Sequence, residues 1–135
     1  MSLFNVMSVS GSALDAQSVR LNAISSNLAN ANVVAGSPDA VYRARQPVFS
    51  SVMDGVDSGA AGVRVEGIYE STLPARQEFN PSHPMADEEG YIYRSNVNSV
   101  DEMANMISAS RSYQSSIEAM NTAKQLILRT LTLGR

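Results

Sequence analysis

The stretch SVDEMANMISASRSYQSSIEAMNTAKQLILRTL, residues 99–131, decides the fold, and it contains neither glycine nor proline. Alternating steps of three and four residues through it select one seam, the pattern of a helix that packs against other helices. The seam positions are Met103, Met106, Ser110, Tyr113, Ile117, Met120, Lys124, Ile127 and Leu131. A helix of about 33 residues is about 50 Å long, more than the width of a domain of this size, so it needs a partner beyond a compact core.

The first residues of this helix resemble a helix cap, and two of its seam positions are polar. Ser99 and Glu102 form the pattern of a capping box, and Asp101 lies where the positive end of the helix dipole favours an acid. Ser110 and Lys124 occupy seam positions at which an isolated two-stranded coiled coil would carry Leu or Ile. We therefore expect a multi-helix environment rather than a simple zipper.

A second seam of the same spacing runs through residues 3–31 and offers the long helix a partner. Its positions are Leu3, Met7, Ser10, Leu14, Gln17, Leu21, Ile24, Leu28 and Ala31. The first 35 residues carry only two charged side chains, Asp15 and Arg20, whereas a surface helix usually has a charged face. The pattern indicates a helix that protein covers on several sides; an ordinary core helix is the alternative. Asn30, Asn32 and the sequence Gly36-Ser37-Pro38 are expected to end it.

The middle of the chain changes from helical to strand-like patterns. Residues 41–49 and 63–69 are predicted to be short strands of a hairpin or ribbon, with Pro47 confining the first to an edge. Between them, DGVDSGAAG at residues 54–62 is predicted to be a flexible loop, because it is polar and rich in glycine.

A connector follows the predicted ribbon. Residues 78–90, EFNPSHPMADEEG, contain two prolines in a polar stretch and predict a connector of defined shape. The prolines are expected to set the direction in which the chain enters the long helix. Residues 91–93 are a further candidate strand.

These patterns predict a mainly α fold with a small β insertion. The long N- and C-terminal helices are expected to pair as an antiparallel coiled coil, with a short β hairpin or ribbon between them. Three segments follow along the chain: the N-terminal helix in residues 1–35, the β-containing middle segment and connector in residues 36–96, and the C-terminal helix in residues 97–135.

The composition excludes several classes of partner. Hydrophobic residues make up 44%, enough for a core, whereas charged residues make up only 17%, which suggests that protein covers much of the surface. The net charge of -3 gives no basic footprint for nucleic acid and no polybasic membrane patch. No run approaches the roughly 20 apolar residues of a membrane span. Because cysteine is absent, disulfides and thiolate metal sites are excluded.

The sequence offers little for catalysis. His83 is the only histidine, so common nucleophile–base pairs and histidine-rich zinc sites cannot be assembled. Asp87, Glu88 and Glu89 nearby are a possible cation site, but a polar turn is favoured because adjacent carboxylates do not converge as ligands must. The methionines of the seam could line a peptide groove; core filling is the preferred interpretation. We expect no enzyme, no cofactor and no metal.

Two stretches resemble a known family. SNLANAN, residues 26–32, resembles the signature of the bacterial flagellar axial proteins of rod and hook. NPSHPMADEEGYIYRSNVNSVDEMANMISASRSYQSSIEAMNTAK, residues 80–124, is similar to the C-terminal block of the proximal rod proteins of the flagellar basal body. The length and the final LTLGR, residues 131–135, also fit that family. The chain departs from it at residues 94–97, where relatives often have a proline before Asn-Val.

The resemblance implies a structural subunit of the proximal rod that assembles helically and transmits motor torque across the periplasm. The implied partners are other copies of the chain, other rod proteins, and the adaptor protein and membrane ring at the rod base. MSLFNVMSVSG, residues 1–11, lacks the features of a secretory signal peptide, and composition alone would indicate the cytoplasm. The resemblance instead implies export to the basal body through the flagellar type III apparatus, without a cleaved signal.

Nine residues of the two seams are expected to form the helical core and to support assembly. They are Leu14, Leu21, Ile24, Leu28, Met106, Tyr113, Ile117, Met120 and Ile127. The rival hypothesis is a helical export chaperone or adaptor of the flagellar secretion system, which would need a charged exterior. The charge-poor N-terminal helix argues against it.

Overall fold

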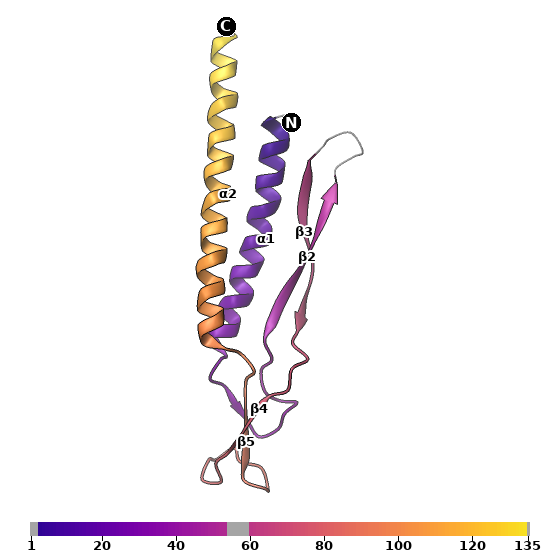
Figure 1. Ribbon diagram of the computed structural model, residues 1–135, viewed down its shortest axis with the longest axis vertical. Helices are drawn as coiled ribbons and strands as arrows, with labels where there is room; N and C mark the ends of the chain where they lie inside the picture. Colours follow the sequence, from indigo (N-terminus) through magenta and orange to yellow (C-terminus); the bar gives the residue numbers. More distant parts are fainter. Residues whose placement is uncertain (1–2, 54–59, 135) are drawn as a thin grey trace. The chain divides into compact units, whose positions relative to one another are not determined.

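A computed structural model describes residues 3–53 and 60–134 (Figure 1). It contains two long helices, and the strands lie between these helices in the sequence. In chain order the elements are α1 (Leu3–Ala29), β1 (Val34–Ala35), β2 (Arg45–Met53), β3 (Ala61–Glu70), β4 (Arg76–Phe79), β5 (Tyr91–Arg94) and α2 (Ser99–Leu133). The prediction of two long terminal helices around a small β region is confirmed. Within the described residues, no helix combines the length and apolar character that crossing a membrane requires.

The chain divides into two compact units, each built from several segments. Unit 1 comprises Met1–Leu21, Pro47–Gly67 and Ile107–Arg135, and unit 2 comprises Asn22–Gln46 and Ile68–Met106. Unit 1 therefore contains the first part of α1, most of the β2–β3 ribbon and most of α2. Unit 2 contains the end of α1, the start of α2 and the strands β1, β4 and β5.

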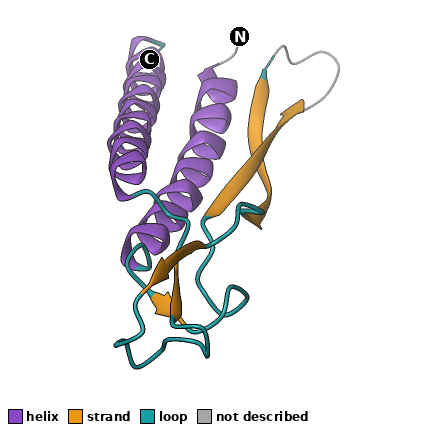
Figure 2. Cartoon of the chain, turned by 60° about the horizontal axis from the view of Figure 1, so that its bottom comes forward, coloured by secondary structure: helices purple, strands orange, loops and turns teal. Residues whose placement is uncertain are grey.

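Unit 2 is built on a small antiparallel sheet with the strand order β1-β5-β4. In the central strand, Ile92 is fully buried, and Tyr93 pairs with Ala35 on one side and with Gln77 on the other. Loops gather around this sheet (Figure 2). The sequence predicted β5 but missed β4, because Arg76-Gln77-Glu78-Phe79 is exposed on every residue and shows no alternation of apolar and polar side chains.

The connector between β4 and β5 is a structured turn. Asp87 Oδ1 accepts hydrogen bonds from the amides of Glu89 (3.0 Å) and Tyr91 (2.8 Å), and the Tyr93 hydroxyl donates to Asp87 Oδ2 (3.2 Å). Gly90 has a φ of 83°, a backbone conformation that favours glycine. The prediction of a defined shape is confirmed. The expectation that the connector leads into α2 is wrong, because β5 and residues 95–98 intervene.

The β2–β3 ribbon is a two-stranded sheet whose strands run in opposite directions (Figure 1). β2 begins at Arg45 rather than at Val41 and extends to Met53, and Pro47 lies within it. Residues 54–59 of the predicted loop lie outside the described residues, while Ala61 and Gly62 already belong to β3. In unit 1, the amide of Val63 donates to Ser12 Oγ of α1 (3.1 Å), so a serine of the helix contacts the ribbon.

The long helix α2 begins where the sequence predicted but is capped by a different residue. Asn98 Oδ1 accepts a hydrogen bond from the amide of Val100 (3.1 Å), and Asn98 Nδ2 donates to Asp101 Oδ2 (2.7 Å). Asn98 is therefore the N-cap residue, and the predicted capping box of Ser99 with Glu102 is wrong. Glu102 is instead only 7% exposed.

Candidate functional site

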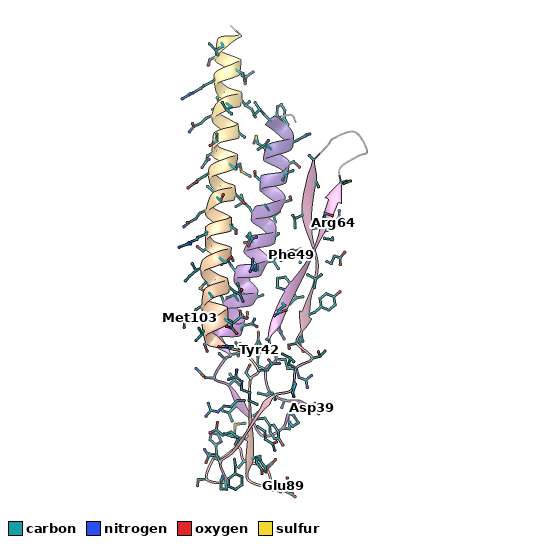
Figure 3. All side chains as sticks on the ribbon, viewed as in Figure 1. Asp39, Tyr42, Phe49, Arg64, Glu89 and Met103 are labelled. Carbon is teal, nitrogen blue, oxygen red and sulfur yellow. The ribbon has the colours of Figure 1, made fainter. Side chains whose placement is uncertain are left out.

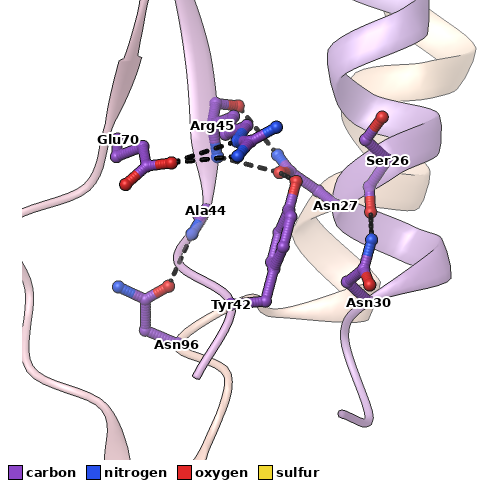
Figure 4. A network of polar contacts seen from close by, with 8 residues as sticks. All are labelled: Ser26, Asn27, Asn30, Tyr42, Ala44, Arg45, Glu70 and Asn96. Carbon is purple, nitrogen blue, oxygen red and sulfur yellow. Dashed lines mark hydrogen bonds and ion pairs between the residues drawn. The ribbon is translucent and has the colours of Figure 1, made fainter. Parts of the chain in front are cut away.

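The amide side chain of Asn27, near the C-terminal end of α1, joins the helix to the chain that enters β2 (Figure 4). Its Nδ2 donates to the carbonyl of Arg45 (2.9 Å), while its Oδ1 accepts from the Arg45 amide (2.8 Å) and from the Tyr42 hydroxyl (3.0 Å). Asn27 is only 1% exposed. Because an unpaired amide at such a site would be costly, these three hydrogen bonds fix where β2 begins.

A second asparagine, Asn96, binds the backbone of Ala44, the residue just before β2. Asn96 Oδ1 accepts a hydrogen bond from the amide of Ala44 (2.8 Å), and its Nδ2 donates to the carbonyl of Leu73 (3.0 Å). The amide of Ser71 donates to the carbonyl of Ala44 (2.7 Å). Asn96 thus bridges the segment that enters the ribbon and the segment that leaves it.

Charged and aromatic groups complete this set of contacts. Arg45 forms an ion pair with Glu70 (3.0 Å), and its guanidinium lies 5.4 Å from the centroid of the Tyr42 ring. Burial raises the pKa of Tyr42 above its ordinary value of 10.0, and the charge of Arg45 opposes this shift. We call Asn27, Tyr42, Ala44, Arg45, Glu70 and Asn96 the asparagine joint. Its groups pair with one another, so the arrangement serves to position backbone rather than to perform a reaction.

The sequence contained a partial signal for this joint. Asn27 lies in SNLANAN, a motif of the family resemblance, and Asn96 lies in residues 94–97, where the chain departs from the family. Tyr42, Arg45 and Glu70 gave no signal. Their partners lie up to 25 residues away, as in the bond from Arg45 Nε to Glu70 Oε1, and no periodicity in the chain reports such a pairing.

The structure places the nine predicted helical-core residues at different depths. Ile24 is buried, with 5% exposed, and Ile117 is 37% exposed. The other seven are half-buried: Leu14, Leu21, Leu28, Met106, Tyr113, Met120 and Ile127. In unit 1, a Cβ built on Gly11 of α1 would lie 3.8 Å from Met120 Cε of α2, an ordinary van der Waals distance.

The most buried positions of α2 are smaller than the sequence suggested. Ala109 and Ala123 are 0% and 3% exposed, whereas Met103 and Leu131, both on the predicted seam, are 56% and 65% exposed. At two of the seam positions, the buried residue is therefore the one just before the predicted residue: Ala109 precedes Ser110, and Ala123 precedes Lys124. Small side chains permit close approach of backbones, and a search for large apolar residues overlooks them.

Many large apolar side chains of α2 remain exposed. Met103, labelled in Figure 3, belongs to this group. The others include Val100, Ile107, Leu126, Leu128 and Leu133, the last of these 84% exposed. Contiguous exposed apolar surface marks sites of contact with other protein, and these exposed side chains make α2 the candidate element for such a contact.

Comparison with known proteins identifies the family. Residues 7–36 match the family described as "Flagella basal body rod protein", and residues 88–133 match "Flagellar basal body rod FlgEFG protein C-terminal". The chain is 49% identical over 136 residues to the flagellar basal-body rod protein FlgC of Yersinia enterocolitica, with both chains covered completely. It is 47% identical over 135 residues to FlgC of Salmonella typhimurium, again with complete coverage of both, and 43% identical to FlgC of Buchnera aphidicola from Acyrthosiphon pisum, with 99% of each chain covered. The chain therefore belongs to the FlgC family of flagellar basal-body rod proteins.

Proposed function

We propose that this structural rod subunit assembles helically in the proximal part of the flagellar rod, together with copies of itself and other rod proteins, and transmits motor torque across the periplasm. Full-length similarity to FlgC proteins supports the rod assignment. The observation that carries the assembly is the number of exposed large apolar side chains on α2, which a lone subunit leaves in water. A stiff rod needs close-packed helices, since packed protein interiors have low compressibility.

The two long helices are proposed to pair as an antiparallel coiled coil. The close approach between Gly11 and Met120 supports this pairing in unit 1. The proposed helical core contains Leu14, Leu21, Ile24, Leu28, Met106, Tyr113, Met120 and Ile127, with Ala109 and Ala123 filling the closest positions. Ile117 is proposed to serve assembly, because a third of its surface is open in the single chain.

The location and the route to it are also proposals. The family implies the periplasmic part of the basal body, export through the flagellar type III apparatus without a cleaved signal, and an adaptor protein and membrane ring as neighbours at the rod base. The alternative of an export chaperone is not favoured, since the relatives are named as parts of the rod. The relatives' names describe a structural component and no reaction. The asparagine joint agrees with this role, because its polar groups bond to one another.

Complementation of a strain that lacks the gene tests the function. The native chain should restore swimming and complete basal bodies. Ile117→Asp should abolish both, because assembly would bury a charge without a partner. Ser115→Asp, a charge added at an exposed position of the same helix, is the control and should leave both intact. Normal motility with Ile117→Asp would show that Ile117 has no role in the core or in assembly.

A further inference from the structure

Two arginines lie directly opposite each other on the small sheet of unit 2. Arg76 of β4 pairs with Arg94 of β5 in the register of these strands, and we call them the arginine pair. Like charges directly opposite each other destabilise an antiparallel pair of strands. Glu78 forms an ion pair with Arg94, but the side chain of Arg76 has no ion-pair partner in the part of the chain that the structure describes. The arginine pair therefore lacks one counter-charge.

The arginine pair lines a cavity of about 240 Å³ in unit 2. The rest of the lining comes from residues 31–32, 95 and 97–100, none of which is charged. Asp101, in the first turn of α2, is not part of the lining, and the side chain of Asn98 holds its carboxylate (2.7 Å). The cavity thus presents two guanidinium groups and no carboxylate of its own lining, which suits it to an anionic group from outside the chain.

The other end of the same sheet carries two exposed acids. The register of β4 with β5 runs from the arginine pair to Phe79 opposite Tyr91, three residues or about 10 Å away. The connector turn lies beyond this last pair, and both Glu88 and Glu89 are exposed in it (Figure 3). Hydrogen bonds inside the turn occupy Asp87, whereas neither glutamate forms an ion pair within the described residues. The turn therefore presents two free carboxylates.

We infer that Glu88 and Glu89 of one copy enter the cavity of the arginine pair in a second copy. This inference rests on the proposed assembly and names a contact within it. The acidic turn and the cavity are different surfaces at opposite ends of one sheet, so the contact joins copies head to tail. Such a heterologous contact produces an open array or a ring, as a rod requires, and not a closed two-fold dimer.

Charge complementarity selects a second copy as the occupant. Among the described residues, Glu88 and Glu89 are the only neighbouring acids that are both exposed. Two carboxylates on a turn match two guanidinium groups in a cavity, and arginine binds a carboxylate through two parallel hydrogen bonds. Contacts of this kind mainly fix the orientation and register of two partners. The exposed apolar side chains of α2 then supply most of the affinity.

Cysteine cross-linking in basal bodies tests the contact, because the chain has no cysteine of its own. Ser99→Cys places a thiol in the lining of the cavity, and Glu88→Cys places one in the turn, while the arginine pair and Glu89 keep their charges. Mild oxidation of the double variant should give a ladder of disulfide-linked multimers, since each copy links to two neighbours. Each single variant should give no ladder, and a disulfide within one chain would not raise the molar mass.

Charge reversal in this double-cysteine chain separates a specific contact from mere proximity. Arg76→Glu should reduce the multimers about tenfold, because an attraction becomes a repulsion. The same change puts an acid opposite Arg94, which favours the sheet, so a loss of multimers does not report a loss of folding. Adding Glu89→Arg to that chain should restore the multimers. Gln77→Glu adds a negative charge on the opposite face of the same strand and should leave them unchanged.

Three results would overturn the inference: complete basal bodies without a ladder, a ladder that survives Arg76→Glu, or a lost ladder that Glu89→Arg does not restore. If Ser99→Cys prevents rod formation, Asn32→Cys supplies a thiol from another exposed position of the lining. A failure of the proposed rod function would look different, because cells that lack the chain would then swim and build complete rods.

Discussion

Replacing Asn27 by alanine should destabilise unit 2 more than any other single change in the SNLANAN segment. The change removes three hydrogen bonds, of 2.8, 2.9 and 3.0 Å, from a residue that is 1% exposed. Each bond contributes about 0.5–1.5 kcal/mol net, so the free energy of unfolding should fall by about 2–4 kcal/mol. The lower bound applies if water reaches the Arg45 backbone after the change.

Unfolding in urea, followed by tyrosine fluorescence, is a suitable assay. The chain has no tryptophan, and four of its five tyrosines lie in unit 2, namely Tyr42, Tyr69, Tyr91 and Tyr93. A loss of this size should move the midpoint by about 1–2 M urea. Hydrogen exchange of the Arg45 amide should accelerate in parallel, since Asn27 Oδ1 is its acceptor.

The matched control is Asn30→Ala in the same segment. The side chain of Asn30 makes a single local bond, from Nδ2 to the carbonyl of Ser26 (2.8 Å), at an exposed site. Its loss should cost no more than about 1 kcal/mol. If Asn27→Ala and Asn30→Ala lower the stability equally, or if the Arg45 amide stays protected without Asn27, the asparagine joint does not fix the start of β2.

Three further perturbations have expected outcomes. Gly90→Ala should lower the thermal midpoint, at a cost of about 1–2 kcal/mol, because φ is 83° and the added Cβ would meet Phe79 and Pro81 at 3.1 Å, whereas Gly134→Ala near the chain end should have little effect. Ala109→Leu should reduce helix stability, measured by circular dichroism, by about 1–3 kcal/mol through overpacking, and the exposed Ala104→Leu should not; equal effects would show that Ala109 lies on no packed face. Burial raises the pKa of Tyr42 in the folded chain, so the contribution of Tyr42 to stability is complete below pH 10 and is lost as the pH rises through the folded pKa. Tyr42→Phe should therefore flatten the alkaline limb of a plot of thermal midpoint against pH.

Helix periodicity made the N-terminal and C-terminal helices predictable. The absence of glycine and proline from residues 99–131, together with the heptad seam, gave the start of α2 at Ser99, and the helix ends at Leu133. The strands were harder. β4 consists of four exposed residues whose pairing with β5 comes from backbone hydrogen bonds, so the side chains carry no alternation to detect.

The contacts that join these elements were not predictable, for three physical reasons. Asn27 binds a backbone segment 18 residues away, which depends on the tertiary fold. Asn98 and Ser99 are both good N-cap residues, and only the backbone geometry chooses between them. Ala109 and Ala123 are buried although their side chains are small, and a seam traced through large apolar residues passes over them. The family resemblance includes SNLANAN but supplies no partner for Asn27.

Electron cryomicroscopy of purified basal bodies, from cells whose only copy of this chain carries a C-terminal tag, tests the central claim most directly. The account predicts tag density at the proximal rod in every basal body, rods that are absent when the gene is deleted, and α2 of each copy enclosed by neighbouring subunits along Ile107, Ile117, Leu128 and Leu131. Complete rods without the chain, or tag density confined to the export apparatus, would contradict the claim that it is a structural subunit of the rod.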